Sequence, residues 1–112
     1  MIEADAIRAR ATVTADFQAA LPALDRRLDD WFRAHVVAPR PIVLARKSDG
    51  GNTEDFWLVT DHTGTDDASF RIVYDDAANR YGIECTIQNG VCLFAGYRAT
   101  LADALTDIKV LR

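Results

Sequence analysis

Residues 79–98 carry the feature that most constrains how this chain can fold. Apolar and polar side chains alternate from Tyr81 to Gln88, a period of two that is typical of a half-buried strand. The Asn89-Gly90 pair that follows favours a type I′ turn, because both central residues of that turn need a positive φ. A two-residue loop would place Cys85 opposite Phe94. We therefore predict a β-hairpin here.

The first third of the chain is helical in character. One apolar stripe recurs every three or four residues, which is the spacing of a single helix face. Pro22 lies within the stripe and has no backbone N–H, so we expect a kink or a break there. Pro39 and Pro41 should end the helix near Val37. The stripe consists of Phe17, Leu21, Leu24, Leu28, Trp31 and His35.

Short runs of β-branched and aromatic residues follow, separated by clusters of turn residues. Strands are expected at 42–45, 56–59 and 70–74, in addition to the two strands of the hairpin. A last helix is expected from Thr100. The sequence therefore predicts one α+β domain over residues 1–112, with a long N-terminal helix, a five-stranded antiparallel meander sheet and a short C-terminal helix in two layers.

The composition is that of an ordinary folded protein. With 112 residues, 49% hydrophobic and 27% charged, the chain suits a single domain and differs from disordered sequences. The first residues lack the basic and apolar regions of a secretory signal, and no run of about 18 apolar residues occurs. We expect a soluble, cytoplasmic protein that does not enter a membrane. Its excess of arginine over lysine indicates a bacterial source.

Acidic residues are concentrated in the middle of the chain. Residues 49–76 hold eight acidic side chains and one basic one, and the whole chain has a net charge of −4. Such a field repels phosphate backbones, so we do not expect nucleic-acid binding. In a meander the first and third loops share one end of the sheet, which would gather an acidic end suited to a basic partner. This acidic end comprises Asp49, Glu54, Asp55, Asp75 and Asp76.

No stretch carries a catalytic, metal-binding or nucleotide-binding signature. The chain has two cysteines and two histidines, which narrows the choice of nucleophiles, general bases and metal ligands. His62 and the neighbouring Asp61, Asp66 and Asp67 are suitable ligand types, but their spacing matches no known metal site. We therefore expect no metal, no cofactor and a role other than catalysis.

The sheet face directed away from the helices provides the best functional hint. If Phe56 and Leu58 face the helices, the alternate residues form a second face that contains aromatic side chains. Exposed apolar patches mark association surfaces, and Trp and Tyr are frequent anchors in them. The alternative is that the N-terminal segment or the loops cover this face. The candidate partner-binding residues are Trp57, Val59, Val91, Leu93 and Tyr97.

Two functions are compatible with these features. The first is a small protein-interaction module without enzymatic activity, either a homodimer or a chaperone-like or immunity-like binder of a protein partner. The second is a small-molecule-binding domain or minor enzyme with a pocket between the N-terminal helix and a curved sheet. The residues expected to line that pocket are Trp31, His35, Tyr74 and Tyr81.

Overall fold

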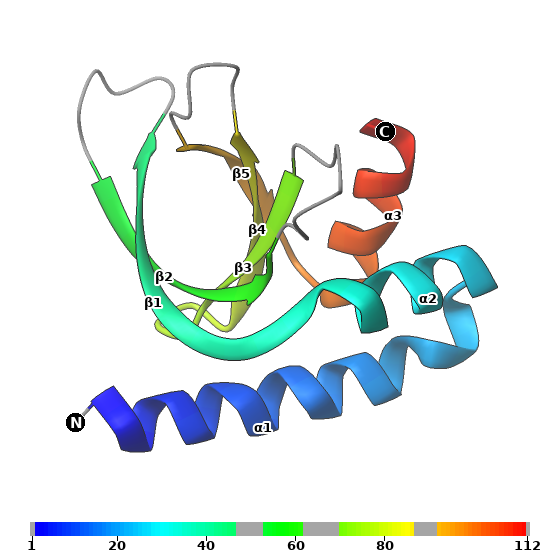
Figure 1. Ribbon diagram of the computed structural model, residues 1–112, viewed down its shortest axis with the longest axis horizontal. Helices are drawn as coiled ribbons and strands as arrows, with labels where there is room; N and C mark the ends of the chain where they lie inside the picture. The colour runs from blue at the N-terminus through cyan, green and yellow to red at the C-terminus, as the bar shows by residue number, and fades with distance from the viewer. Residues whose placement is uncertain (1, 47–52, 62–69, 87–91, 112) are drawn as a thin grey trace.

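The computed structural model describes residues 2–46, 53–61, 70–86 and 92–111. Its helices lie against a strongly curved sheet of five strands, and α1 runs along the base of the molecule (Figure 1). This arrangement confirms the predicted α+β fold and the order of its elements. The elements are α1 (Ile2–Ala20), the 3-10 helix η1 (Leu21–Ala23), α2 (Arg26–His35), β1 (Val36–Arg46), β2 (Thr53–Thr60), β3 (Phe70–Asp75), β4 (Arg80–Thr86), β5 (Cys92–Arg98) and α3 (Leu101–Leu111).

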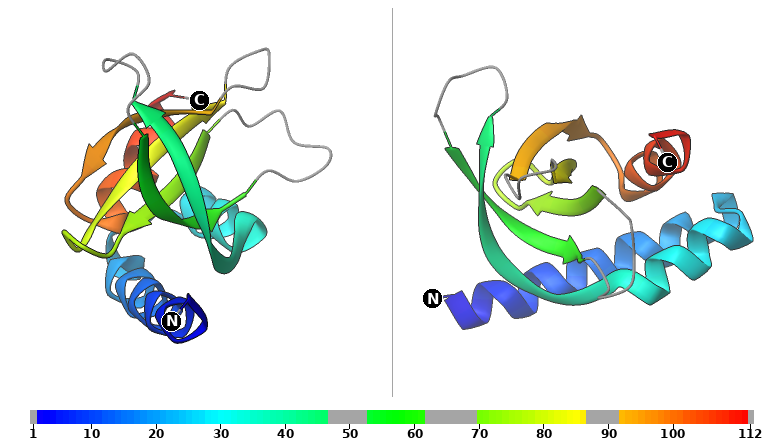
Figure 2. Two further views of the ribbon diagram at one scale, coloured as in Figure 1. Left: turned by 90° about the vertical axis from the view of Figure 1, so that its left-hand side faces the viewer. Right: turned by 45° about the horizontal axis from the view of Figure 1, so that its top comes forward.

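The N-terminal helical region breaks at Pro22, as the missing N–H of proline predicts. α1 ends at Ala20 and η1 holds Pro22 in its first turn. α2 begins after Asp25, whose carboxylate accepts a hydrogen bond from the Leu28 N–H at 3.0 Å. α2 then turns back over the end of α1 (Figure 2). The apolar stripe stays in the core on both sides of the break: Phe17, Leu28, Trp31 and His35 are buried, and Leu21 and Leu24 are partly buried.

β1 starts at Val36, directly after α2, and passes through Pro39 and Pro41. We predicted a strand that begins only after Pro41, so this boundary is wrong. Within the described residues β1 pairs with β5 at Ala45 and Arg46, whereas its pairing with β2 extends from Val36 to Ala45. The first part of β1 is therefore a sheet edge, where a proline can be accommodated without removing a hydrogen bond of the ladder.

The five strands pair in chain order, and the sheet closes on itself. Each strand is antiparallel to the next, as predicted for a meander, and β5 returns to pair in parallel with β1. Closure encloses one face of the sheet, while α1, α2 and α3 cover part of the other face. The protein therefore has two apolar clusters. The cluster inside the barrel contains Leu44, Phe56, Leu58 and Val73.

The β4–β5 pairing keeps the predicted register from Tyr81 to Ile83 and differs from it by one residue from Glu84 to Thr86. We expected Cys85 opposite Phe94, but Cys85 pairs with Leu93. The register shifts between Ile83 and Glu84, as it does at a β-bulge, where one strand contributes an extra residue. Alternation alone does not reveal such a bulge. The predicted Asn-Gly turn lies outside the described residues.

A chain of ion pairs connects β4 to β1. The Glu84 side chain is fully buried, and its carboxylate accepts a hydrogen bond from Arg71 Nε at 2.6 Å. Arg71 Nη1 also lies 3.1 Å from Asp61, which pairs with the exposed Arg40 at 2.7 Å. Burial removes the hydration of a carboxylate, and the hydrogen bond from Arg71 replaces part of it.

Replacing Glu84 with glutamine should destabilise the fold strongly. Glu84→Gln leaves the Arg71 guanidinium beside a neutral amide, and breaking a buried ion pair on one side costs about 3–5 kcal/mol of unfolding free energy. Urea unfolding of wild type and variant measures this loss.

The matched control is Asp30→Asn. The Asp30–Arg26 pair spans 4.0 Å and both side chains are mostly exposed, with 71% and 94% of their surface accessible. Exposed pairs of this kind contribute about 0–1 kcal/mol. Equal losses in the two variants would contradict the role given to Glu84.

Candidate functional site

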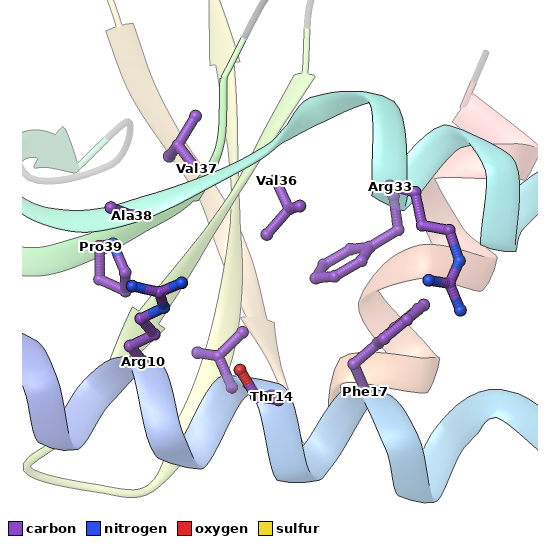
Figure 3. Close-up of a pocket in the computed structure, with 10 residues that line it drawn as sticks. Arg10, Thr14, Phe17, Arg33, Val36, Val37, Ala38 and Pro39 are labelled. Carbon is purple, nitrogen blue, oxygen red and sulfur yellow. The ribbon is translucent and has the colours of Figure 1, made fainter.

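A groove lies between α1 and the start of β1, with the last turns of α2 at one end (Figure 3). Its volume is about 320 Å³, within the range of sites that bind small molecules or single anchoring side chains. Most of its lining is apolar, and its only charged side chains are arginines. The lining residues are Arg10, Val13, Thr14, Phe17, Phe32, Arg33, Val36, Val37, Ala38 and Pro39.

The floor of this groove comes from the buried face of α1. Val13 and Phe17 lie one helical turn apart on that face, and both are buried. The Phe17 ring stacks on Phe32 of α2, with ring centroids 4.3 Å apart and an interplanar angle of 19°. The break at Pro22 is what returns Phe32 to Phe17. The floor therefore depends on the helix hairpin as well as on the apolar pattern of α1.

Two arginines stand at opposite ends of the groove. Figure 3 shows Arg10 beside Pro39 and Arg33 beside Phe17. The Arg33 guanidinium lies 5.2 Å from the centre of the Phe17 ring, and its Nε donates a hydrogen bond to Asp29 at 2.6 Å. No residue in the described part of the chain forms an ion pair with Arg10. Among the described residues no carboxylate lines the groove, although the chain as a whole has a net charge of −4.

The exposed apolar side chains of the described residues gather along α1 and β1. Val36 lines the groove and is 41% exposed, and Val43 further along β1 is 61% exposed. Ile7 is 69% exposed and precedes Arg10 by three residues, which places both on one side of α1. The apolar surface therefore continues beyond the groove along α1.

The part of the predicted partner-binding face that lies on β2 is not exposed. Trp57 and Val59 are buried in the cluster under the helices, because Trp57 pairs with Tyr74 across β2 and β3 and shares its face. Our assignment of the two faces of β2 was wrong by one residue. Tyr97 packs against the cluster inside the barrel. For the other two candidates, Leu93 is described only by its place on β5 opposite Cys85, and Val91 lies outside the described residues.

The predicted acidic end is only partly described. Asp75 pairs with Arg80 at 3.3 Å, and the Asp76 carboxylate accepts a hydrogen bond from Trp57 Nε1 at 3.1 Å. Asp55 is exposed on β2. Glu54 is placed on β2 opposite Leu44, and Asp49 lies outside the described residues. Among the described side chains, no group of three His, Cys, Asp or Glu is arranged to hold a metal ion.

The four predicted pocket residues are all buried, and they lie in two pairs. On α2, the Trp31 and His35 rings stack with centroids 4.4 Å apart. Across β3 and β4, the Tyr74 and Tyr81 rings lie 5.1 Å apart. Their hydroxyl groups donate hydrogen bonds, from Tyr81 to Asp16 at 2.6 Å and from Tyr74 to Asn79 at 2.9 Å.

Each tyrosine reaches a separate cavity. Tyr81 lines a cavity of about 390 Å³ between α1 and α3, and Tyr74 lines one of about 240 Å³ beside the first turns of α1. Trp31 and His35 line neither of these cavities, nor the groove. None of these three cavities therefore brings the four residues together.

The sequence analysis did not identify Arg10, Phe32 and Arg33 as residues of this groove. It also did not identify Asp16, which lines the cavity beside Tyr81. One signal was present, because Arg10 and Thr14 flank the apolar positions Val13 and Phe17 on α1. Which side of that helix borders a groove depends on the path of β1, and this path is not a local property of the sequence.

Tyr81 should make the stability of the fold sensitive to alkaline pH. Burial, followed by the hydrogen bond to Asp16, raises the pKa of the Tyr81 hydroxyl above its ordinary value of 10.0. The unfolded chain then releases this proton at lower pH than the folded protein does. The unfolding free energy should therefore fall as the pH rises above about 10, by up to about 1.4 kcal/mol for each pH unit and proton.

The variant Tyr81→Phe tests this assignment. It removes the titrating hydroxyl and keeps the ring, so its unfolding free energy should depend less steeply on pH than that of wild type. Denaturant unfolding at several values between about pH 9 and pH 11 measures both slopes. Parallel slopes would contradict the assignment to Tyr81.

Comparisons of the chain with protein-family models, with curated proteins and with solved structures found no match. None of the helices in the described part of the chain is long and apolar enough to span a lipid bilayer. The candidate functional site is the groove, in which an apolar floor lies between two arginines.

Proposed function

We propose that this chain is a non-enzymatic protein-interaction module whose groove between α1 and β1 binds an acidic amphipathic helix of a partner protein. The observation that carries the proposal is the composition of the groove. It combines an apolar floor with Arg10 and Arg33 and contains no carboxylate, although the chain as a whole is acidic. The proposal places this module in the bacterial cytoplasm and among chaperone-like or immunity-like binders.

The apolar floor supports binding through anchoring side chains. Phe17 and Phe32 form a stacked pair at the base of the groove, and the accessible Val36 extends it. Pockets that bury one or two apolar anchors contribute most of the affinity in many protein interfaces. A partner helix can present such anchors at every third or fourth residue along one face.

The arginines support an acidic partner. A guanidinium group donates hydrogen bonds in a fixed planar arrangement that matches a carboxylate, and arginine is enriched at interfaces. Arg10 has no ion pair with a described residue, so a partner carboxylate would be its first counter-ion. Arg33 already contacts Asp29 and would gain less. We therefore expect Arg10 to contribute more than Arg33 to the charge preference.

The edge of β1 disfavours binding by strand addition. Adding a strand requires backbone N–H groups along a free edge, and Pro39 and Pro41 have none. Of these two prolines, Pro39 lines the groove. Recognition through side chains on a helix therefore fits this surface better than an extended peptide does.

Reversing the charge of Arg10 should reverse the preference of the groove. The probe is a fluorescent amphipathic peptide with leucine on one helix face and glutamate on the other, and its counterpart carries lysine in place of glutamate. Wild type should bind the glutamate peptide more tightly. Arg10→Glu should weaken that binding by about tenfold or more and should favour the lysine peptide. Fluorescence anisotropy measures both affinities.

Arg27→Glu is the matched control, because Arg27 is exposed on α2 outside the groove and the change in net charge is the same. It should leave the preference between the two peptides unchanged. Equal effects of the two variants would mean that only net charge acts, and would overturn the proposal. Sedimentation of wild type tests whether the protein forms a homodimer. If wild type self-associates and Arg10→Glu abolishes the self-association, the groove is occupied by a second copy of this chain and not by a separate partner protein.

A further inference from the structure

We propose that the cavity between α1, β4 and the start of α3 is a second site, which binds a primary alkylammonium group through Asp16. This cavity has a volume of about 390 Å³ and shares no lining residue with the groove. That size lies within the range of sites for small molecules. The inference is independent of the proposed protein-binding function.

Short side chains keep this cavity open. Its walls include Ala19, Ala20 and Ala23 on one side and Ala99 and Ala102 on the other. The methyl groups of these alanines offer apolar contact to an alkyl chain and no hydrogen bond. Polar recognition in the cavity therefore falls to a few side chains, of which Asp16 is the charged one.

Asp16 is held in place and retains acceptor capacity. Its Oδ2 accepts a hydrogen bond from the hydroxyl of Tyr81, which is 2% exposed and lines the same cavity. A carboxylate has about four lone-pair positions, so one hydrogen bond from Tyr81 leaves most of them for a ligand. No residue within the described ranges forms an ion pair with Asp16. A cationic ligand would supply the missing counter-charge.

The remaining polar groups favour an ammonium group over other ligands. No lysine, arginine or histidine lines the cavity, so an anion would meet Asp16 without compensation. The cavity also lacks the set of three or more anionic or imidazole ligands that a divalent metal requires in proteins. An ammonium group donates three hydrogen bonds. Asn79 and Thr100 also line the cavity, and each side-chain oxygen already accepts one hydrogen bond, from the Tyr74 hydroxyl and from the Asp103 N–H, so Asp16 is the main acceptor for a ligand.

The positive end of the α3 helix dipole disfavours a cation in the cavity, but only weakly. A helix N-terminus carries about half a positive charge, less than the full negative charge of Asp16. Asp103 lies in the first turn of α3, and its N–H is capped by Thr100 Oγ1 at 3.1 Å. These groups offset part of the helix dipole. The field in the cavity is therefore dominated by Asp16.

The test is an NMR titration of the protein with n-butylammonium chloride and, separately, with n-butanol, which has the same chain length and no charge. Wild type should show saturable shifts of the backbone amides of residues 99–102 with n-butylammonium and much weaker ones with n-butanol. Asp16→Asn should weaken n-butylammonium binding by about tenfold or more. Unchanged binding by a folded Asp16→Asn protein, or no saturable binding by wild type, would overturn the proposal.

Two further variants keep the test decisive. Asp30→Asn makes the same charge change at an exposed site on α2 and should bind as wild type does. Tyr81→Phe removes the hydrogen bond that holds Asp16 but keeps the carboxylate charge, so binding by the folded variant should fall less than it does in Asp16→Asn. An equal or larger fall would mean that the tyrosine hydroxyl, and not the carboxylate, carries the recognition, and would overturn the proposal. The ammonium group could belong to a lysine side chain of a protein or to a free amine. Nα-acetyl-lysine amide, which keeps its side-chain ammonium, is titrated in parallel to distinguish these two sources. Tighter binding than that of n-butylammonium indicates a protein lysine, and weaker binding indicates a free amine.

Discussion

Both faces of the sheet carry apolar side chains, and the arrangement of the helices and strands follows from how these two faces are buried. Leu58 and Val73 lie inside the barrel, and Val59 and Ile72 lie under the helices, yet all four are fully buried. Burying one such side chain is worth about 1.5–3 kcal/mol, so exposing either face would remove much of the net stability of a small domain. The helices cover one face. The other is enclosed because β5 pairs back onto β1. Closure of the sheet and docking of the helices are therefore both needed to bury its apolar side chains.

Closure also decides where binding can take place. With both faces of the sheet buried, the distinctive surface lies along α1 and the outer side of β1. The buried stripe of α1, which includes Val13 and Ala20, lies between the groove and the cavity. Arg10 lies on the flank that borders the groove, and Asp16 lies on the flank that borders the cavity. One helix thus lines both proposed sites, and each can be altered without touching the lining of the other.

The candidate sites were harder to derive from sequence than the fold, for a physical reason. Alternation along a strand defines two faces but not which of them meets the helices, and for Trp57 the choice depended on its pairing with Tyr74. The bond between Tyr81 and Asp16 joins residues 65 positions apart, and no local pattern connects them. The bulge between Ile83 and Glu84 likewise depends on how β5 bends toward β1.

The sequence by itself determined the type and order of the elements and the break at Pro22. These features follow from local causes, namely the period of the apolar residues and the missing N–H of proline. Three features could be seen only in the tertiary structure: β1 begins before its prolines, the sheet closes, and Trp57 is buried. Those outcomes depend on contacts between segments far apart in the chain, where pairing and burial outweigh the local preferences of each residue.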